Sequence, residues 1–437
     1  MLKKKLLYNT ALLTASSLVM SCIGMAFNVW LVGRIGTAGI GLYELVISVV
    51  NLCATFAISG IRFATTRLIS EEIGLENTVG IRDMMRRCLD YGAFFGLAAA
   101  AVIYFLAEPI GFLWIGDGRT VRSLRLCALS MPCISMCSSL SGYFTACGRV
   151  WKSALVHLIE QLVCIASVAF FLSFVSTGDI EKSCTAVIKG HVTADITSFL
   201  LMLLAYITDR ASHYSEYCTD GKPMKRILKI AVPLAISAYA RSALTTFQHL
   251  LVPRGLREAG YSADSALSGY GIIQGMVLPI LLFPSCIVGV VSNLIVPELT
   301  GSQVQNDTET IRRTVKRLLG LSIGFSCAVA AFMFIFADKL GIVIYDNREA
   351  GHFIRLLAPL VPLMYTDMSV DGCLKGLGQQ VWSMGINVLE SLVGLLLIRT
   401  YLPLYALKAY IGIIYFSELF NFLLSAGRLK QVITSNL

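Results

Sequence analysis

Long apolar stretches, each close to the length of one membrane crossing, alternate with short polar segments along the whole chain of 437 residues. A bilayer core about 30 Å thick needs roughly 20 apolar residues for one helical crossing. Strands of a transmembrane barrel would instead alternate polar and apolar residues at every second position. The pattern therefore predicts an all-α polytopic membrane protein with about twelve transmembrane helices, near residues 7–32, 40–61, 89–107, 123–147, 153–175, 186–207, 227–252, 268–297, 318–337, 353–374, 381–402 and 405–425.

The composition supports a membrane environment and excludes a soluble globular fold. Apolar residues make up 56% of the chain and charged residues 14%, with a mean hydropathy of +0.72. Soluble proteins carry roughly 25% charged residues. The opening residues "MLKKK" are similar to the start of a signal peptide. The apolar stretch that follows is too long for one, so we expect a retained first helix.

The thirteen cysteines are scattered, mostly within predicted helices, and show neither metal-ligand spacing nor an extracellular pairing pattern. We interpret them as small packing residues and predict no metal or cofactor. The net charge of +9 lies in short loops rather than on one basic patch, so no nucleic-acid partner is expected. With a cytoplasmic N-terminus, the inner loops collect roughly 22 Lys and Arg residues against roughly 13 outside, which predicts cytoplasmic termini.

An internal repeat divides the chain. The segment "IRDMMRRCLD" at Ile81 matches "IRRTVKRLLG" at Ile311, and the match continues without a gap for about 80 residues at a shift of about 230. The pairs in this register include Glu108 with Asp338, Arg125 with Arg355, Pro132 with Pro362, Gly142 with Gly372, Gly148 with Gly378 and Glu160 with Glu390. We predict two homologous six-helix lobes, 1–208 and 227–437, joined by a cytoplasmic linker at 209–226.

The repeat also indicates a class of function. Six crossings separate corresponding helices, so the two halves enter the membrane from the same side and form parallel repeats. Such repeats typically place a substrate cavity near the membrane midplane, and one lobe rocks against the other to give alternating access. The sequence therefore predicts a transporter.

Two stretches are similar to a known family: "GTAGIGLYELVISVVNLCATFAISGIRFATTRLISEE" and "LLVPRGLREAGYSADSALSGYGIIQGMVLPILLFPSCIVGVVSNLIVPELT". They resemble the stage V sporulation protein B-like family of the multidrug/oligosaccharidyl-lipid/polysaccharide exporter superfamily, over nearly the whole chain. The resemblance implies an exporter fold and a flippase for polyprenyl-diphosphate-linked sugars, including peptidoglycan precursors, in the bacterial cytoplasmic membrane. It also implies a lipid-linked saccharide substrate, contact with membrane lipids and cell-wall synthesis enzymes as partners. Larger relatives carry fourteen helices.

Arg241 lies near the middle of the seventh predicted crossing, too deep to reach the interface easily. An ionisable residue at such a depth usually faces a cavity or pairs with another charged group. A guanidinium offers a bidentate fork that suits phosphate. We predict that Arg241 faces the central cavity and binds a diphosphate; the alternative is a structural pair with a carboxylate of a neighbouring helix.

Other polar residues are predicted to line the same cavity. The repeat aligns Asn28 with Gln248 and Arg34 with Arg254. Hydrogen bonds to sugars and hydrogen bonds between helices are equally compatible with the two amides, and the two arginines also suit a role as interfacial anchors. Two further amides of the second and eighth helices are candidates for substrate binding: Asn51 and Gln274.

Four titratable residues are candidates for ion coupling. Glu160 and Glu390 occupy the same position in the two halves, where each either carries a coupling proton or packs as a hydrogen-bonded neutral acid. His191 and Asp195 lie one helical turn apart and form either a proton relay or a simple pair. A stripe of charged residues in the tenth helix either points inward or neutralises itself: Asp367, Asp371 and Lys375.

The sequence contains no motif that indicates an enzyme. The phosphate-cradling motif GxxxxGK[ST] is absent, and no cluster of His, Cys and carboxylate residues indicates a nucleophile or a metal. A membrane-embedded glycosyl transferase lacks a loop with paired carboxylates. A multidrug cation antiporter of the same fold remains an alternative, although its expected acidic centre near the first or seventh helix is replaced by Arg241. A non-transporting scaffold for sporulation or cell-wall enzymes is the other alternative.

Overall fold

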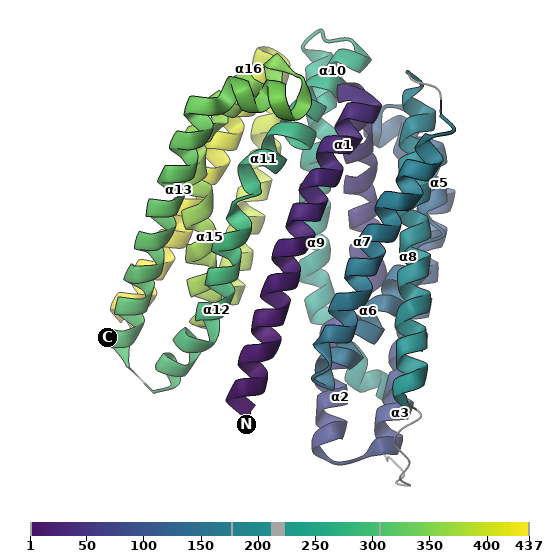
Figure 1. Ribbon diagram of the computed structural model, residues 1–437, viewed down its shortest axis with the longest axis vertical. Helices are drawn as coiled ribbons and strands as arrows, with labels where there is room; N and C mark the ends of the chain where they lie inside the picture. Colours follow the sequence, from purple (N-terminus) through teal and green to yellow (C-terminus); the bar gives the residue numbers. More distant parts are fainter. Residues whose placement is uncertain (1, 176–177, 211–222, 306, 436–437) are drawn as a thin grey trace. The chain divides into compact units, whose positions relative to one another are not determined.

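The computed structural model describes residues 2–175, 178–210, 223–305 and 307–435, and every regular element in these ranges is helical (Figure 1). The elements are α1 (Leu2–Ile58), α2 (Ile61–Gly74), α3 (Thr78–Phe105), α4 (Ala107–Pro109), η1 (Ile110–Ile115), η2 (Gly118–Thr120), α5 (Val121–Cys127), α6 (Met131–Ala146), α7 (Val150–Leu172), α8 (Ile180–Arg210), α9 (Pro223–Glu258), α10 (Ala263–Gly271), η3 (Ile272–Val277), α11 (Leu278–Leu282), α12 (Ser285–Val304), α13 (Thr308–Tyr345), α14 (Arg348–Leu357), η4 (Ala358–Leu360), α15 (Val361–Gly376) and α16 (Gln380–Ser435). The predicted all-α class is confirmed.

Within the described ranges, nine helices are long and apolar enough to cross a membrane, or ten if the bent pair Gly118–Cys127 and Met131–Ala146 forms one span. Two of these spans contain a break in the helical backbone, at Gly36 (φ 71°) and at Ala406 (φ 52°). The break at Gly36 falls between the predicted crossings 7–32 and 40–61, and the break at Ala406 falls at the start of the predicted crossing 405–425. Helices α1 and α16 therefore each contain two predicted crossings. Glycine at position 36 allows this left-handed turn without the steric cost of a Cβ atom.

The repeat seen in the sequence reappears as repeated local contacts. The side chain of Asn77 caps α3 by accepting from the Gly80 amide, and Asp307 caps α13 by accepting from the Thr310 amide. Both pairs are related by the same register shift of about 230 residues. Because capping side chains satisfy otherwise unpaired amides, the duplication has kept the signal that starts the third helix of each half.

An ion pair is repeated in the same register. Arg125 donates to Glu108 at 2.7 Å, and Arg355 donates to Asp338 at 2.5 Å. The four residues match one another in the sequence repeat. The first pair joins α4 to α5, and the second joins α13 to α14. The two halves are thus duplicated in contacts as well as in sequence.

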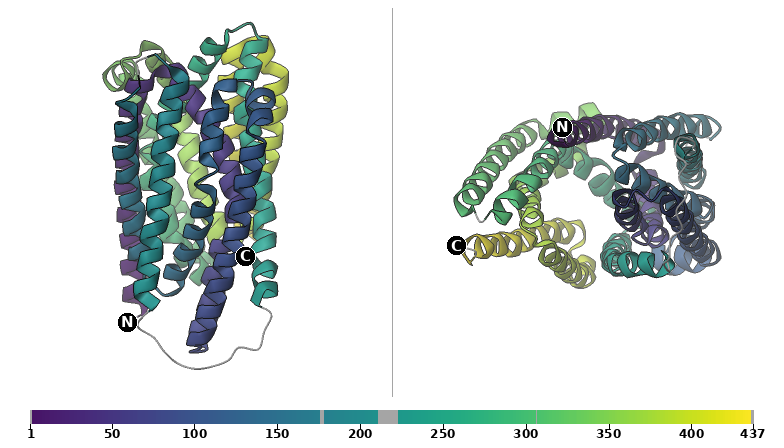
Figure 2. Two further views of the ribbon diagram at one scale, coloured as in Figure 1. Left: turned by 90° about the vertical axis from the view of Figure 1, so that its right-hand side faces the viewer. Right: turned by 90° about the horizontal axis from the view of Figure 1, so that it is seen from below.

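By contact density the chain forms two compact units: Met1–Ser16 with Leu45–Thr246, called unit 1, and Ser17–Glu44 with Phe247–Leu437, called unit 2. Helices α1 and α9 therefore each contribute residues to both units. The helices of each unit run roughly alongside one another, as the end-on view in Figure 2 shows. The predicted lobes, 1–208 and 227–437, are defined by the sequence repeat, whereas the two units are defined by contacts between residues. The lobe boundaries stay a prediction.

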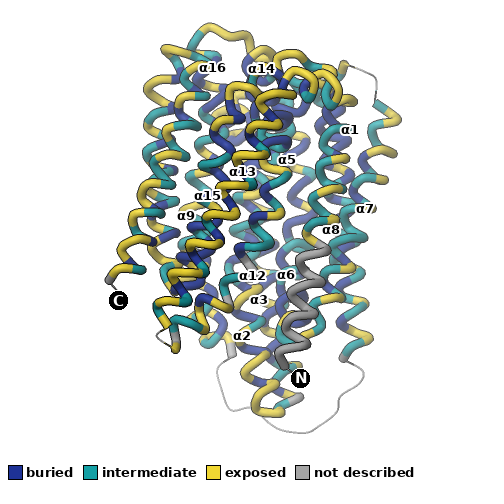
Figure 3. The backbone as a smooth tube through the Cα atoms, turned by 60° about the vertical axis from the view of Figure 1, so that its left-hand side comes forward, coloured by how far each residue is buried: buried dark blue, intermediate teal, exposed yellow. Residues whose placement is uncertain are grey.

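Each unit has its own apolar core at one end of its helices. In unit 1, Leu68, Met85 and Phe144 belong to a cluster in which α2, α3, α6 and α8 meet. In unit 2, Leu318 and Leu374 belong to the corresponding cluster of α12, α13, α15 and α16. Outside these cores many large apolar side chains are exposed, and Figure 3 shows buried and exposed residues alternating along α13. Such surfaces suit a hydrocarbon solvent.

A close crossing of two helices organises unit 2. The hydroxyl of Ser268 in α10 donates to Thr37 of α1 at 2.7 Å. One turn further on, Gly41 lies against the carbonyl of Leu267, and Gly271 lies against the carbonyl of Thr37. Small residues allow membrane helices to approach until their backbones touch. This crossing fixes the second part of α1 on α10, which continues directly into η3 with Gln274.

Candidate functional site

A polar cluster lies inside unit 1, between α6, α7 and α8. The carboxylate of Glu160 accepts a hydrogen bond from Ser198 at 2.6 Å and contacts His157 Nδ1 at 3.1 Å. The thiol of Cys137 lies 3.7 Å from the Ser198 hydroxyl. Glu160 therefore joins α7 to α8, and Ser198 extends the cluster to α6 in the interior of the unit, a place where a polar group needs partners.

The predicted pair of α8 lies close to this cluster. His191 Nδ1 is 3.5 Å from the thiol of Cys164 on α7. Asp195 is half-buried and lies three residues before Ser198 on the same helix, so the two share a face. The direct His191 to Asp195 relay stays a prediction, as does ion coupling through Glu160.

Unit 2 contains a polar cluster at the equivalent positions. Asn421 of α16 donates to Asp367 of α15 at 3.3 Å and to Asn387 at 3.2 Å. In the repeat register Asp367 corresponds to Cys137, and Asn387 corresponds to His157. Glu390, the counterpart of Glu160, is half-buried on the same helix as Asn387. Each half therefore carries a polar group among its fourth, fifth and sixth helices.

The charged stripe of α15 separates into two parts. Asp371 accepts from Ser383 and pairs with Lys375 at 2.5 Å, so this part neutralises itself. Its counterpart in unit 1 is a pair of hydroxyls, Ser141 and Ser153, 2.9 Å apart. By contrast, one carboxylate oxygen of Asp367, Oδ1, is buried without a hydrogen-bond partner among the described residues.

Three of the predicted substrate ligands take part in hydrogen bonds between helices of unit 2. The hydroxyl of Tyr345 donates to Asn28 at 2.8 Å, and Gln248 donates to the carbonyl of Ser391 at 2.9 Å. Gln274 donates to the hydroxyl of Tyr410 at 2.6 Å. It belongs to η3, a π-helical turn of the kind found frequently at functional sites. In these contacts the three amides hold helices together.

The two arginines at the ends of the first and seventh crossings are exposed. Arg34 lies over the ring of Trp30 with its guanidinium carbon 5.8 Å from the ring centre. Arg254 donates to Glu258 of the same helix at 3.4 Å. Both arrangements suit residues at a membrane interface.

Arg241 and Asn51, the remaining substrate candidates, belong to unit 1 and are both exposed. Arg241 lies halfway along α9. Within the described residues its guanidinium forms no ion pair with a carboxylate. A row of polar contacts holds this part of α9 against α1: Tyr239 donates to Ser59 at 2.6 Å, and Thr246 donates to the carbonyl of Ser48 at 3.0 Å.

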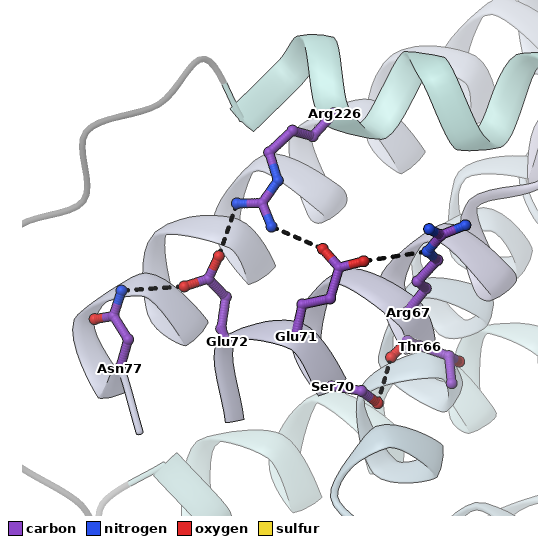
Figure 4. A network of polar contacts seen from close by, with 7 residues as sticks. All are labelled: Thr66, Arg67, Ser70, Glu71, Glu72, Asn77 and Arg226. Atoms are coloured by element: carbon purple, nitrogen blue, oxygen red, sulfur yellow. Dashed lines mark hydrogen bonds and ion pairs between the residues drawn. The ribbon is translucent and has the colours of Figure 1, made fainter. Parts of the chain in front are cut away.

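A charged clamp secures the beginning of α9 (Figure 4). Arg226 donates to Glu72 at 2.8 Å and to Glu71 at 2.9 Å, and both acceptors lie at the end of α2. Glu72 also accepts from Asn77 at 3.0 Å, and Arg67 donates to Glu71 at 3.1 Å. Figure 4 shows Arg226 reaching down from α9 between the two carboxylates.

The last helix of each half docks on the loop between its fourth and fifth helices. In unit 1, Asp209 accepts from Lys152 at 2.6 Å and from Arg149, and this hydrogen bond raises the pKa of Arg149. In unit 2, Arg428 donates to Gln379 at 2.8 Å and lies 4.4 Å from the ring centre of Trp382. In the register of about 230 residues, Gln379 and Trp382 replace Arg149 and Lys152.

Sequence reasoning missed Asn387 and Asn421, which complete the polar cluster of unit 2. Asn387 is the repeat counterpart of His157, so comparison of the two halves would have found it. Asn421 has no such signal, since the alignment does not extend to the last helices. In the part of the chain that the structure describes, no group of three or more His, Cys, Asp or Glu residues is placed to hold a metal ion.

The duplicated helical bundle with polar groups inside each half defines a membrane transporter fold. The sequence model of the MatE family matches residues 13–171 and 259–402, which together make up more than half of the chain. The chain belongs to the MatE family. It is a multi-pass membrane protein of the multidrug/oligosaccharidyl-lipid/polysaccharide exporter superfamily. The resemblance predicted from the sequence is confirmed.

Two relatives from Bacillus subtilis (strain 168) are similar over most of the chain. Stage V sporulation protein B is 23% identical over 401 residues, which cover 91% of this chain and 77% of that protein. Sporulation protein YkvU is 20% identical over 382 residues, which cover 85% and 84%.

Solved structures agree with the fold. An inward-facing multidrug resistance MATE family transporter aligns with a TM-score of 0.69 at 15% identity, covering 94% of this chain and 95% of that one. A transporter of the same superfamily from Pyrococcus furiosus, described as having a binding pocket of reverse polarity, aligns with a TM-score of 0.65 at 14% identity, covering 97% and 96%.

Proposed function

We propose that this protein is a flippase that moves an anionic lipid-linked sugar precursor of peptidoglycan or another polysaccharide across the bacterial cytoplasmic membrane. Both termini lie in the cytoplasm, and transport proceeds by alternating access. The similarity to a sporulation protein supports a role in building the cell wall or spore envelope, where synthetic enzymes for such precursors are natural partners.

Arg241 is the observation that carries this proposal. Its guanidinium lies halfway along a membrane helix, is exposed, and has no carboxylate partner among the described residues. A fixed cation at this depth is costly, so such residues usually face a cavity or a partner and mark a functional site. A diphosphate supplies the bidentate acceptors that a guanidinium prefers. Asn51, Asn28, Gln248, Gln274, Arg34 and Arg254 are the proposed contacts to the rest of the substrate.

The energy for transport would come from an ion gradient acting on the interior polar clusters. Glu160 and Glu390 are the proposed carriers, with His191 and Asp195 as a relay in the first half. A carboxylate that joins two helices, as Glu160 joins α7 to α8, can alter their packing when it gains a proton, because its hydrogen bonds with Ser198 and His157 change.

A multidrug cation antiporter is the second candidate. The observation in its favour is a set of half-buried carboxylates in unit 2: Asp367, Glu390 and Glu418. One oxygen of Asp367 has no partner among the described residues, so this set could accept a cation or a proton. The solved neighbours include a multidrug resistance transporter, which is compatible with this reading.

Ligand-induced thermal stabilisation separates the two candidates. The purified protein is compared with Arg241→Ala and with a control, Arg313→Ala, whose exposed arginine pairs with Glu309 of its own helix. The ligands are an undecaprenyl-diphosphate-linked sugar, undecaprenyl phosphate and a panel of organic cations. We expect the diphosphate lipid to stabilise the native protein and the control but not Arg241→Ala. Stabilisation by cations alone would contradict the flippase and favour the antiporter.

A further inference from the structure

The step from α1 to α2 in unit 1 is a break at which two residues have left-handed backbone, Ser59 (φ 44°) and Gly60 (φ 71°). Glycine adopts this conformation freely, whereas serine rarely does. Ser59 is also deeply buried, at 2% exposed. A Cβ atom on Gly60 would lie 2.6 Å from the carbonyl oxygen of Ala231, so the backbone of α9 runs directly against the break. A buried serine with this backbone persists only where its surroundings hold it in place.

Side chains from three helices hold the break. Tyr91 of α3 donates to the carbonyl of Ser59 at 3.1 Å, and its hydroxyl lies 2.9 Å from the hydroxyl of the same serine. Ser135 of α6 donates to the carbonyl of Ala57 at 2.7 Å. These hydroxyls supply donors to carbonyls at the end of α1, where the helix no longer continues. Tyr239 of α9 donates to the Ser59 hydroxyl at 2.6 Å and so joins α9 to a point that α3 and α6 fix.

The equivalent place in the other half has no such break. The register of about 230 residues holds here, since Gly142 lies against Arg62 and its counterpart Gly372 lies against Ser292. In this register the counterpart of Ser59 is Gly289, which lies inside the continuous helix α12.

The two tyrosines are missing from the other half as well. Tyr91 corresponds to Leu321, which is 61% exposed. In the alignment that pairs the first helix of each half, Tyr239 corresponds to Val19, and the counterpart of Arg241 is a serine. Because the other copy folds without either tyrosine, the contact is not a general requirement of this helix junction. The tyrosine contact and the fixed cation occur together on α9, and both are absent from its counterpart.

Hydrogen bonds along α9 define the side of this helix that faces α1. Tyr239, Ser242 and Thr246 each form a hydrogen bond with α1. At about 100° per residue these three share one side of the helix, and Arg241 lies about 200° round from Tyr239, on the opposite side. The direction of the guanidinium therefore depends on the rotation of α9. Tyr239 makes the shortest contact of the three, its 2.6 Å hydrogen bond to Ser59.

Other contacts hold this part of α9 at its two ends. Arg226 binds carboxylates of α2 at the beginning of the helix, and Thr246 contacts α1 beyond Arg241. Loss of the Tyr239 hydroxyl would leave both, together with the contact between its ring and that of Phe56, whose centres lie 5.5 Å apart. The helix would stay docked, while its rotation next to Arg241 would be less fixed.

We propose that Tyr239 is a positioning residue: through Ser59 it fixes the rotation of α9 and so holds the Arg241 guanidinium toward the diphosphate group of the substrate. The inference rests on the proposed flippase function and adds the residue that aims its cation. Tyr239 acts through Arg241 and does not itself touch the substrate.

Two matched hydroxyl deletions test this role. Tyr239→Phe removes the contact between α9 and Ser59, whereas Tyr91→Phe removes a hydroxyl that reaches the same serine from α3. Each full-length variant is titrated with undecaprenyl diphosphate, and the midpoint of its thermal unfolding is measured without ligand. We expect Tyr239→Phe to weaken binding about tenfold, the worth of one hydrogen bond to a charged group, and to keep the native midpoint. Tyr91→Phe should lower the midpoint and keep the native affinity. Native affinity in Tyr239→Phe, or an equal loss in both variants, would overturn the proposal.

A second measurement needs no ligand. In Arg241→Cys the introduced thiol reacts with a water-soluble maleimide, and mass spectrometry of its peptide gives the rate. We expect this rate to change about threefold or more when Tyr239→Phe is added, because the exposure of a thiol controls its reaction. Adding Tyr91→Phe should leave the rate unchanged. A rate that ignores Tyr239→Phe would contradict the positioning role.

The two measurements separate the positioning role from the proposed function. If the native protein does not bind undecaprenyl diphosphate, the flippase proposal fails, while a thiol rate that changes with Tyr239→Phe still supports the positioning of residue 241. If the native protein and Tyr239→Phe bind the lipid equally, the flippase function is retained and the positioning role is rejected.

Discussion

Arg226 holds Glu72 at 2.8 Å, and this contact ties the first turn of α9 to the last turn of α2. Glu72 is 2% exposed, whereas Arg226 is 40% exposed. The carboxylate is therefore deeply buried and depends on its partners for compensation of its charge. The clamp sets the position of the helix that carries Arg241.

We expect Arg226→Gln to lower the free energy of unfolding by about 2 kcal/mol, because it leaves a buried carboxylate without its cation. The effect stays below that of a fully buried pair since Arg226 itself is partly solvated. Arg67→Gln is the control: it removes an exposed i, i+4 pair with Glu71 and should change stability by less than about 0.5 kcal/mol. Thermal unfolding in detergent measures both. Equal effects would show that Glu72 does not depend on Arg226.

The crossing of α1 and α10 predicts a strong effect of a single methyl group. In Gly41→Ala the new Cβ would overlap the carbonyl of Leu267, a backbone atom that cannot move aside alone. We expect destabilisation by about 2 kcal/mol or more. Gly33→Ala, on the same helix, meets no atom within 4 Å and should be neutral or slightly stabilising. A thermal scan in which the two variants behave alike would argue against the crossing.

Removing the charge of Asp209 should destabilise unit 1. In Asp209→Asn, Arg149 and Lys152 lose the carboxylate that accepts from both, and two like charges face each other. We expect a loss of about 2 kcal/mol, measured by thermal unfolding. Combining Asp209→Asn with Lys152→Gln should recover part of the loss, because the repulsion is removed. No recovery in the double variant would indicate that repulsion is not the cause.

Glu160 allows a test of ion coupling that does not depend on folding. Glu160→Gln keeps an acceptor for Ser198 but cannot release or bind a proton. We expect it to fold normally and to transport without dependence on pH. Ser198→Ala keeps the carboxylate and should retain the pH dependence. Transport rates in liposomes across a range of pH decide the matter; an unchanged profile in Glu160→Gln would assign it a packing role.

Much of the fold follows from the sequence because a membrane imposes simple rules. Apolar stretches of the right length had to be helices. The break at Gly36 falls where the pattern separates neighbouring crossings, and the break at Ala406 lies four residues past the predicted end of the crossing before it. The repeat paired Arg125 with Arg355 and Glu108 with Asp338, and the structure places each arginine on its own acid. Such pairs could be anticipated because duplicated contacts keep their register.

The partners of single polar residues were harder to predict. For Asn28 and Gln248 the sequence left hydrogen bonds to sugars and hydrogen bonds between helices equally open, and it made Gln274 a candidate for substrate binding. The structure gives each of the three a hydrogen-bond partner on another helix. Tyr345 lies 317 positions from Asn28 in the chain, so no local pattern links the two residues. Helical periodicity gives the direction of a side chain but does not identify the helix it meets. For the same reason Asn421 went unnoticed.

The docking of the last helix in each half constrains how this protein can have evolved. Asp209 meets two cations in the first half, whereas Arg428 meets an amide and an aromatic ring in the second. Exchange of these helices between the halves would set Arg428 against Arg149 and Lys152. The last helix of one half can therefore no longer replace the last helix of the other. After duplication, the loop and the final helix of at least one copy must have changed together, and recombination between the copies would now be selected against.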